Sequence, residues 1–472
     1  MFTKRTAAAA GALAAAVGCA AAGATAPAAA STTSTTSTTS TTSTTSTARH
    51  AARPVPLTAG HISTASLTTP PTTAQCEQLF KIACYSPVQY AQAYDLHRAW
   101  NAGFTGRGRT IVLVDSFGSP TIRHDLSTFD ATYNLPDPPS LKILTPVGAI
   151  PPYDNSAERQ NWAGETTLDV EYAHAIAPDA NIVLVETPVA ETEGVTGFPE
   201  IVAAENYVID HGIGDVISQS FGATEQTFPS RQSLLNLRSA FVNARAHHVT
   251  MLAGSGDAGA TNFTLSGSSL YPFRVNSWPS SDPLVTSLGG TMLHLDATGN
   301  RTSPDETWND GFGAGGGGSS LFFARPVFQD PVRAVVGDRR GTPDISMSAA
   351  VNGAAIMYYS YDPANVGYHL VGGTSEASPI FAGVVAIAAQ IHGSRVGDIN
   401  PALYALGQSN LRTGIIDVTK GNNTFGGVTG FPATRGYDLA TGWGTVNVTD
   451  FATALAQQTG QLALTQQALT DR

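Results

Sequence analysis

The chain has 472 residues and a formal net charge of −11, and 42% of its residues are hydrophobic while only 13% are charged. The charged fraction lies well below the roughly 25% usual for soluble domains, which favours a compact exported protein over a disordered or coiled-coil one. The acidic balance disfavours nucleic acid as a partner, and solubility alone is enough to explain it.

Residues 1–30 predict a signal peptide. Lys4 and Arg5 precede an alanine-rich apolar run that ends in small residues suited to signal peptidase. Because alanine and glycine partition weakly into lipid, the run does not predict a transmembrane anchor, and we expect a secreted, extracellular protein. Cys19 leaves open a lipoprotein anchor, which is less favoured because the leucine usually found three residues earlier is missing.

Residues 31–75 predict a flexible linker, since they begin with a repeated Ser-Thr-Thr triplet and stay polar. Cys76 and Cys84 come next. In an exported chain, two cysteines this close favour one local disulfide bond. The cysteines and histidines form no pattern typical of a zinc site.

From about residue 85 the sequence alternates between buried strands and helices. We expect strands over 109–118, 180–187, 215–222 and 249–257, and helices over 167–178, 204–212 and 238–248. This alternation predicts an α/β fold with a doubly wound, mostly parallel sheet and helices on both faces. Ligands in such folds bind at the carboxyl ends of the strands. Asp115, Ser220 and Asp257 lie at or near such ends, as does the loop before Ser375.

The segment "GGTSEASP" at 372–379 leads into an apolar helix and presents Ser375 as a candidate nucleophile on a tight turn. A serine needs a neighbouring base to take its proton. Asp115 resembles the first acid of a subtilisin triad, but no histidine lies in the sequence context that such a triad requires. We therefore interpret Asp115 as a structural residue at the end of a strand.

A better base lies in "WAGETTLDVEYAHAIAP", where Glu165 and Asp169 are four residues apart and share one face of a helix. Two carboxyl groups this close resist simultaneous ionisation, so the pair can hold one proton and present one basic oxygen. By itself the spacing is more typical of an exposed acidic helix face. The surrounding motifs decide between the two interpretations.

The motifs "GETTLD", "GSGDAG" and "GGTSEASP" occur in this order, with "CYSPVQYAQAYDL" near the start and "GYDLATGWGTVN" near the end. Together they resemble the sedolisin family of serine-carboxyl peptidases, which have a subtilisin-like fold and a glutamate in place of the histidine. The resemblance covers about residues 84–455 and implies a peptidase domain over 76–458. Residues 459–472 would then be a C-terminal tail.

The resemblance implies a role for each catalytic position. Ser375 is the nucleophile, Glu165 is the general base and then the acid, and Asp169 orients Glu165 and shares its proton. Asp257 takes the place of the oxyanion-hole asparagine of subtilisins and can donate only when protonated; the backbone N–H of Ser375 is the second donor. Since a carboxylate remains basic where an imidazole is already protonated, the resemblance implies an endopeptidase that cleaves proteins or peptides at acid pH.

The resemblance also implies one structural Ca²⁺ ion. Its ligands would be the side chains of Asp417 and Asp438 and the carbonyl oxygens of Val418, Thr434 and Gly436. An all-oxygen set suits this hard cation. The family usually has glycine at the position of Thr434, which weakens the prediction of that ligand.

Family members usually carry a long N-terminal prodomain, whereas only the linker separates the signal peptide from the peptidase domain here, so we expect a member whose prodomain is absent or encoded elsewhere. We also expect a monomer. Two other hypotheses stay open. One is a subtilisin-like Ser/His/Asp hydrolase active near neutral pH, with a histidine beside Asp115 and Ser375. The other is a secreted binding protein on a catalytically idle peptidase fold, against which the presence of all four catalytic residues argues.

Overall fold

The structure is a computed structural model that describes residues 60–62, 67–409 and 413–470. The predicted signal peptide, Cys19 and most of the predicted linker lie outside these residues. All the described residues belong to a single unit that extends over residues 50–472.

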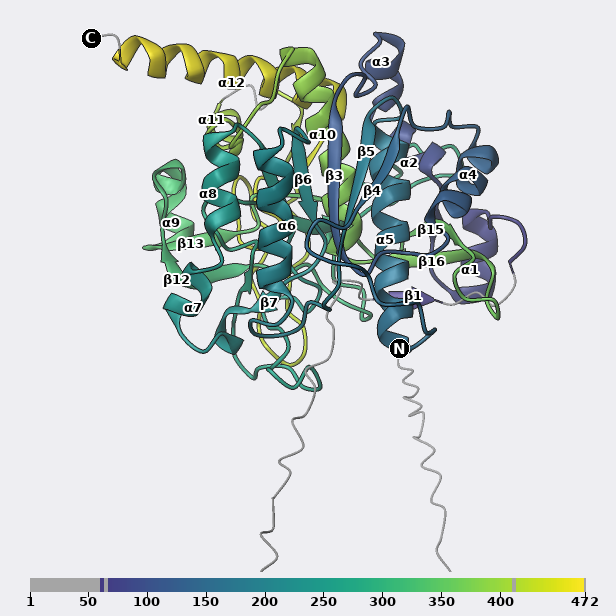
Figure 1. Cartoon of the computed structure of the whole chain (residues 1–472). Helices are drawn as coiled ribbons and strands as arrows, with labels where there is room; N and C mark the ends of the chain where they lie inside the picture. Colours follow the sequence, from purple (N-terminus) through teal and green to yellow (C-terminus); the bar gives the residue numbers. More distant parts are fainter. Residues whose placement is uncertain (1–59, 63–66, 410–412, 471–472) are drawn as a thin grey trace, which may run out of the picture. The chain divides into compact units, whose positions relative to one another are not determined.

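One large sheet forms the centre of this unit, with the strand order β11-β10-β8-β6-β3-β5-β4 and with β14 also paired to β10 (Figure 1). Its strands are β3 (Thr110–Ser116), β4 (Leu141–Leu144), β5 (Asn181–Thr187), β6 (Val216–Gln219), β8 (Thr250–Gly254), β10 (Thr286–Met292), β11 (Glu306–Thr307) and β14 (Ile345–Ser348). All pairs are parallel except β10 with β11. The predicted, mostly parallel α/β sheet is confirmed.

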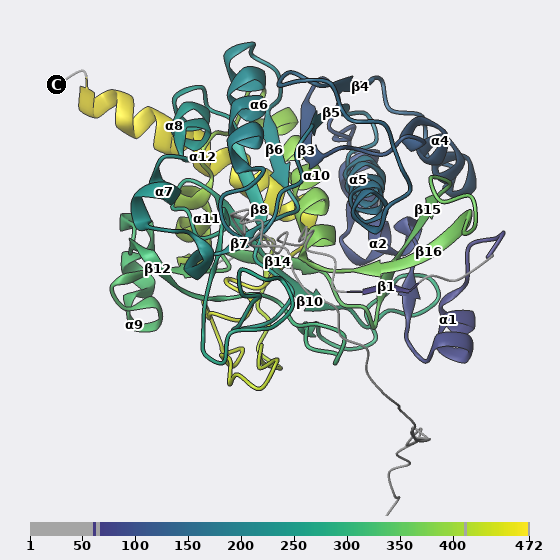
Figure 2. The same ribbon diagram turned by 60° about the horizontal axis from the view of Figure 1, so that its bottom comes forward.

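Alternate side chains of each strand enter two separate cores, because successive residues of a strand point to opposite faces. Ile111 and Leu113 of β3 join the core with α5 (Ala157–Ile176) and α10 (Thr374–His392). Val112 and Val114 join the core with α6 (Phe198–Asp210) and α8 (Ser239–Ala246). Helices therefore cover both faces, as predicted (Figures 1 and 2).

A second, four-stranded sheet leads to the candidate nucleophile. Its order is β1 (Gly60–Ile62), β16 (Gly367–Gly372), β15 (Ala354–Tyr359) and β2 (Cys84–Tyr85). Gly60 pairs with Gly372, the last residue of β16, and α10 begins two residues later. The predicted disulfide joins Cys76 to Cys84, with an S–S distance of 2.06 Å. Residues 60–62 of the predicted linker thus form a strand of this sheet.

The last described helix, α12 (Val448–Thr470), includes most of the predicted C-terminal tail. The remaining elements are α1 (Thr73–Phe80), α2 (Pro87–Ala93), α3 (Leu96–Asn101), α4 (Ile122–Tyr133), β7 (Ala223–Thr224), η1 (Glu225–Thr227), α7 (Arg231–Leu235), β9 (Ser277–Trp278), β12 (Gly318–Ala324), η2 (Val327–Val332), α9 (Arg333–Val336), β13 (Arg339–Thr342), α11 (Asn400–Gln408), β17 (Ile415–Ile416) and β18 (Thr445–Val446). Among the described helices only α10 is long and apolar enough to cross a membrane, and 89% of its apolar window is buried inside the protein, as in a core helix.

Candidate active site

Ser375 is the second residue of α10 and its side chain is fully buried. The preceding Gly373 has a φ of 151°, a backbone conformation that residues other than glycine rarely adopt. The hydroxyl of Ser375 donates a hydrogen bond to the carbonyl oxygen of Ser220 at 3.3 Å. A strand, a glycine turn and a helix N-terminus thus fix the position of this hydroxyl.

Glu165 and Asp169 lie four residues apart on α5, and both are fully buried. Helices α5 and α10 pack so closely that a Cβ atom added to Gly383 of α10 would lie only 2.6 Å from the Cβ atom of Ile176 of α5. Burial raises the pKa of Glu165 well above its usual value, and the hydroxyl of Ser375 opposes this rise. The hydroxyl of Ser375 on α10 therefore lies beside the carboxyl pair of α5.

Ser220, one residue after β6, joins this pair to the nucleophile. Its hydroxyl lies 2.7 Å from Oδ1 of Asp169, to which it donates a hydrogen bond, and 3.3 Å from the carbonyl oxygen of Ser375. Burial raises the pKa of Asp169 well above its usual value, the charges of Asp115 and Glu165 raise it further, and the Ser220 hydroxyl opposes them. A pair of this kind can retain one proton and accept another from a hydroxyl.

Asp257 follows β8 and is held against the residue before the nucleophile. Its Oδ1 accepts hydrogen bonds from the backbone N–H of Thr374 at 2.7 Å and from the Thr374 hydroxyl at 2.9 Å. That hydroxyl also accepts a bond from the N–H of Gly256 at 3.0 Å. The two loops at the carboxyl ends of β8 and β16 are therefore tied together beside Ser375.

Asp115 lies at the end of β3 as expected. It is fully buried, and its charge is among those that raise the pKa values of Glu165 and Asp169. In the sequence, the position of Asp115 at the end of a predicted strand was the feature that pointed to it, and the same holds for Ser220. What the sequence did not predict is that both side chains turn toward the carboxyl pair.

Among the described residues, none of the groups that shift the pKa of Asp115 is a histidine. Burial raises the pKa of Asp115 to about 7, opposed by the hydroxyl of Thr166 and assisted by the charge of Glu186. His174, on the same helix as the carboxyl pair, lies 3.3 Å from Asp130 and bonds to the carbonyl oxygen of Pro136. The structure thus surrounds Asp115 with acids and a hydroxyl.

The five residues predicted to hold Ca²⁺ come together in one loop region. The N–H of Gly436 donates to Asp417 at 2.9 Å, the N–H of Thr434 donates to Asp438 at 2.7 Å, and Val418 follows Asp417. Burial raises the pKa of Asp438 to about 6. Over the described ranges, no three acidic, histidine or cysteine side chains group as a metal site, so main-chain carbonyls would have to complete the coordination. The two carboxylate groups are the kind of oxygen ligand that Ca²⁺ accepts.

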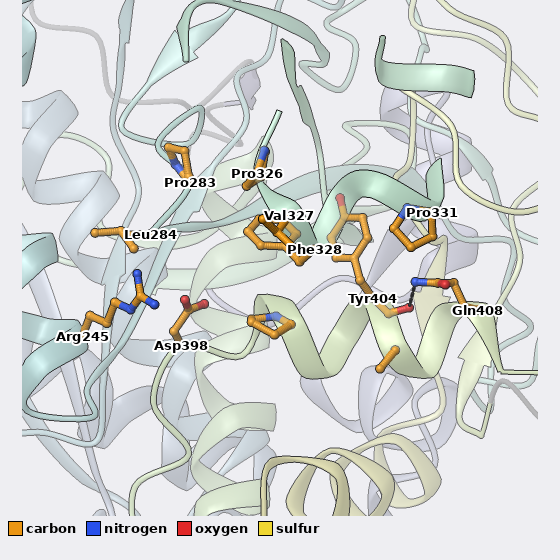
Figure 3. A pocket seen from close by; sticks show the side chains of 12 residues that line it. Arg245, Pro283, Leu284, Pro326, Val327, Phe328, Pro331, Asp398, Tyr404 and Gln408 are labelled. Atoms are coloured by element: carbon orange, nitrogen blue, oxygen red, sulfur yellow. Dashed lines mark hydrogen bonds between the residues drawn. The ribbon is translucent and has the colours of Figure 1, made fainter. Parts of the chain in front are cut away.

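A pocket of about 640 Å³ (Figure 3) lies at the end of the central sheet that is opposite to Ser375. Its lining includes Arg245 at the end of α8, Leu284 just before β10, and Asp398 and Tyr404 around α11. These positions lie at the amino ends of the strands, whereas Ser375 lies with the carboxyl ends. The pocket therefore does not belong to the candidate active site.

Comparison with profiles of known protein families gave no match. The chain is 30% identical to kumamolisin from Bacillus sp. (strain MN-32) and 29% identical to sedolisin from Pseudomonas sp. (strain 101). These alignments cover 76% and 77% of this chain, which spans 61% and 60% of the two relatives. A solved structure of Pseudomonas sedolisin, a serine-carboxyl proteinase in complex with pseudo-iodotyrostatin, matches with a TM-score of 0.68 and 25% identity, over 80% of this chain and 99% of that one.

Proposed function

The chain belongs to the sedolisin family, and on that premise we propose that it is a secreted serine-carboxyl endopeptidase that hydrolyses proteins or peptides at acid pH. The observation that carries this proposal is the buried Glu165–Asp169 pair beside the hydroxyl of Ser375. This pair provides a base at a pH where a histidine would already carry a proton.

In the proposed reaction, the Oγ atom of Ser375 attacks the peptide carbonyl carbon while Glu165 accepts its proton. Glu165 then gives this proton to the leaving amine, and the C–N bond breaks to leave an acyl-enzyme. Water attacks the ester, Glu165 takes the proton of the water, and it finally returns that proton to Ser375. Asp169, held by Ser220, keeps Glu165 oriented and shares its proton.

Asp257 stabilises the oxyanion in this proposal. Its Oδ1 is bound by Thr374, so the carboxyl group is fixed one residue from the nucleophile. The carboxyl must be protonated, since a carboxylate would repel the negative oxygen that forms in the transition state. Ionisation of Asp257 therefore contributes to the loss of activity toward neutral pH.

A pH–activity profile on an unfolded protein substrate tests the proposal. We expect a maximum on the acid side for the wild-type protein and no hydrolysis at any pH for Ser375→Ala, whose folding can be checked by its melting temperature. A wild-type maximum at pH 7 to 8 would favour the subtilisin-like alternative. Substrate binding without turnover at any pH would favour the idle binding protein.

We also propose that Asp417 and Asp438, with the carbonyl oxygens of Val418, Thr434 and Gly436, hold one structural Ca²⁺. An ion that binds only the folded state stabilises it by mass action. A chelator should therefore lower the melting temperature of the wild-type protein, and excess Ca²⁺ should restore it. Asp438→Ala should abolish this response, whereas Asp296→Ala, which removes a carboxylate from an exposed turn, should retain it. Retention of the response in Asp438→Ala would rule out this site.

A further inference from the structure

We propose that Glu186 is a positioning residue that keeps Asp115 uncharged beside the catalytic carboxyl pair and thereby sets the upper pH limit of the active site. This inference rests on the proposed function. Glu186 lies on β5, outside the four catalytic positions, and reaches the pair only through Asp115.

The pairing of β3 with β5 puts the two acids next to each other. Asp115 and Glu186 are direct register partners in the parallel ladder. Alternation from Leu113 and Leu184, which both pack in the core with α5, directs both carboxyl groups toward α5 and its catalytic pair. Asp115 is fully buried and Glu186 is 9% exposed. Four acids thus form one continuous group, from Glu165 and Asp169 through Asp115 to Glu186.

The turn after β3 is built around the Glu186 carboxyl group. Gly118 has a φ of 72°, which favours glycine, and a Cβ atom there would lie 1.9 Å from Oε1 of Glu186, so a side chain at this position would displace that carboxyl group. Phe117 has a φ of 65°, which is uncommon for a residue with a large side chain, and its N–H is bound to the carbonyl oxygen of Thr187. Strained backbone of this kind persists where the surrounding structure requires it, often at functional sites.

A cation at the start of α5 acts on Glu186. The guanidinium group of Arg159, on the first turn of α5, lies 4.2 Å from the centre of the Phe117 ring and donates to the carbonyl oxygen of Pro151 at 3.0 Å. Burial raises the pKa of Glu186 to about 7, and the charge of Arg159 opposes that rise. The charged group that acts on Glu186 is thus Arg159 from α5, and Glu186 in turn acts on Asp115 of β3.

This arrangement directs the first negative charge away from the catalytic pair. As the pH rises toward 7, Arg159 favours ionisation of Glu186, and the resulting charge opposes ionisation of Asp115. Asp115 then stays neutral against Asp169 and Glu165. If Asp115 ionised first, its negative charge beside Glu165 and Asp169 would disfavour the negative charge that develops on the oxyanion at Ser375, and activity would fall as Asp115 ionised.

The test is the pH profile of kcat for Glu186→Gln. At about pH 3 both Asp115 and Glu186 are protonated, so kcat should match the wild type, and KM should match at every pH because Glu186 does not touch the substrate. Without the neighbouring acid, Asp115 should ionise earlier, and the alkaline limb should move down by about 1 to 2 pH units, the usual effect of one nearby charge. The double variant Glu186→Gln/Asp115→Asn should return the limb toward that of the wild type, because asparagine cannot ionise.

Glu205→Gln is the matched control. It removes another fully buried carboxyl group, on α6 in the opposite core, and should leave the profile unchanged. An alkaline limb of Glu186→Gln that coincides with that of this control would overturn the proposal, as would a double variant that stays shifted. A wild-type protein without acid peptidase activity would instead overturn the proposed function, so the two failures are distinguishable.

Discussion

Two buried acidic regions of this molecule differ in what compensates their carboxyl groups. Asp344 faces Arg340, and both side chains are fully buried. The two guanidinium nitrogens donate to the two carboxylate oxygens at 2.6 and 2.5 Å, and the Tyr404 hydroxyl and the N–H of Ser287 donate to the same carboxylate. Glu165 and Asp115 are equally buried, but among the described residues their oxygens find no comparable bonds and no cation contacts them.

Burial alone does not distinguish a structural acid from a catalytic one. A carboxylate that accepts two hydrogen bonds from one arginine is not available for proton exchange, so its role is to stabilise the fold. Acids that are buried without a cation keep a proton, and where several of them lie beside a serine hydroxyl they can exchange it, which is typical of catalytic sites. Substitutions in each of the two regions can test this distinction.

The largest expected effect on stability comes from the structural pair. Arg340→Met leaves Asp344 as a buried charge without its cation and should lower the free energy of unfolding by about 3 to 5 kcal/mol at pH 7, as urea denaturation would measure. The surface pair of Lys420 and Glu306 is the control, since the Lys420 side chain is 72% exposed. Lys420→Met should cost less than about 1 kcal/mol. Equal losses in the two variants would contradict the structural role of Arg340.

The second effect concerns the proposed oxyanion donor. Asp257→Ala should lower kcat about 10²- to 10³-fold, the usual loss for one oxyanion-hole donor, with little change in KM because the contact forms only in the transition state. Asp257→Asn keeps the shape and supplies an N–H that does not titrate, so it should retain some activity and extend it toward neutral pH. Near-normal turnover in Asp257→Ala would show that this aspartate only holds Thr374.

A third effect links stability to pH. Burial raises the pKa of Glu205 from 4.5 to about 8, so the folded state binds this proton more tightly than the unfolded state. The stabilisation is complete below about pH 4.5 and is lost as the pH rises toward 8, by up to about 1.4 kcal/mol per pH unit. Glu205→Gln should match the wild type at pH 4 and exceed its free energy of unfolding by about 2 to 3 kcal/mol at pH 7. A difference that is the same at both pH values would show that the carboxyl group acts only by its shape.

Local patterns predicted the scaffold well, because burial and periodicity are properties of neighbouring residues. The apolar strands that alternate with helices along the chain predicted the parallel sheet, and the spacing of Glu165 and Asp169 placed them on one helix face. Assigning Asp257 and Ser375 to the same site required a family resemblance, since the two lie 118 positions apart in the chain.

Other features depend on contacts that no single stretch of sequence contains. The short strand β1 lies in a polar segment without a strand pattern and exists through its pairing with β16. The directions of the Ser220 and Asp115 side chains follow from the register of β3 and β6 and from the close approach of α5 to α10. These two residues were visible as strand ends, but not as neighbours of the catalytic pair.

The smallest expected effect would show how finely the catalytic pair is held. Ser220→Ala removes the hydroxyl that lies 2.7 Å from Asp169 and opposes the rise of its pKa. Without this bond the pKa of Asp169 should rise further, so the pair should reach its singly protonated form at a higher pH. We expect the acid limb of the kcat profile to move up by about half a pH unit, and kcat at the optimum to fall about 5- to 10-fold, equivalent to about 1 to 1.4 kcal/mol.

Ser218→Ala is the matched control, because Ser218 lies on β6, two residues before Ser220, and its hydroxyl is 2.8 Å from that of Ser378 on α10. It removes an equally buried hydroxyl that bonds to α10 and not to Asp169 on α5. Its acid limb should therefore coincide with that of the wild type. If both variants shifted the limb equally, the effect would come from packing between β6 and α10, and the hydrogen bond of Ser220 would have no special part in holding the proton. A shift confined to Ser220→Ala would mean that a single neutral hydroxyl tunes the catalytic acids, a role that at Asp344 falls to a full arginine charge.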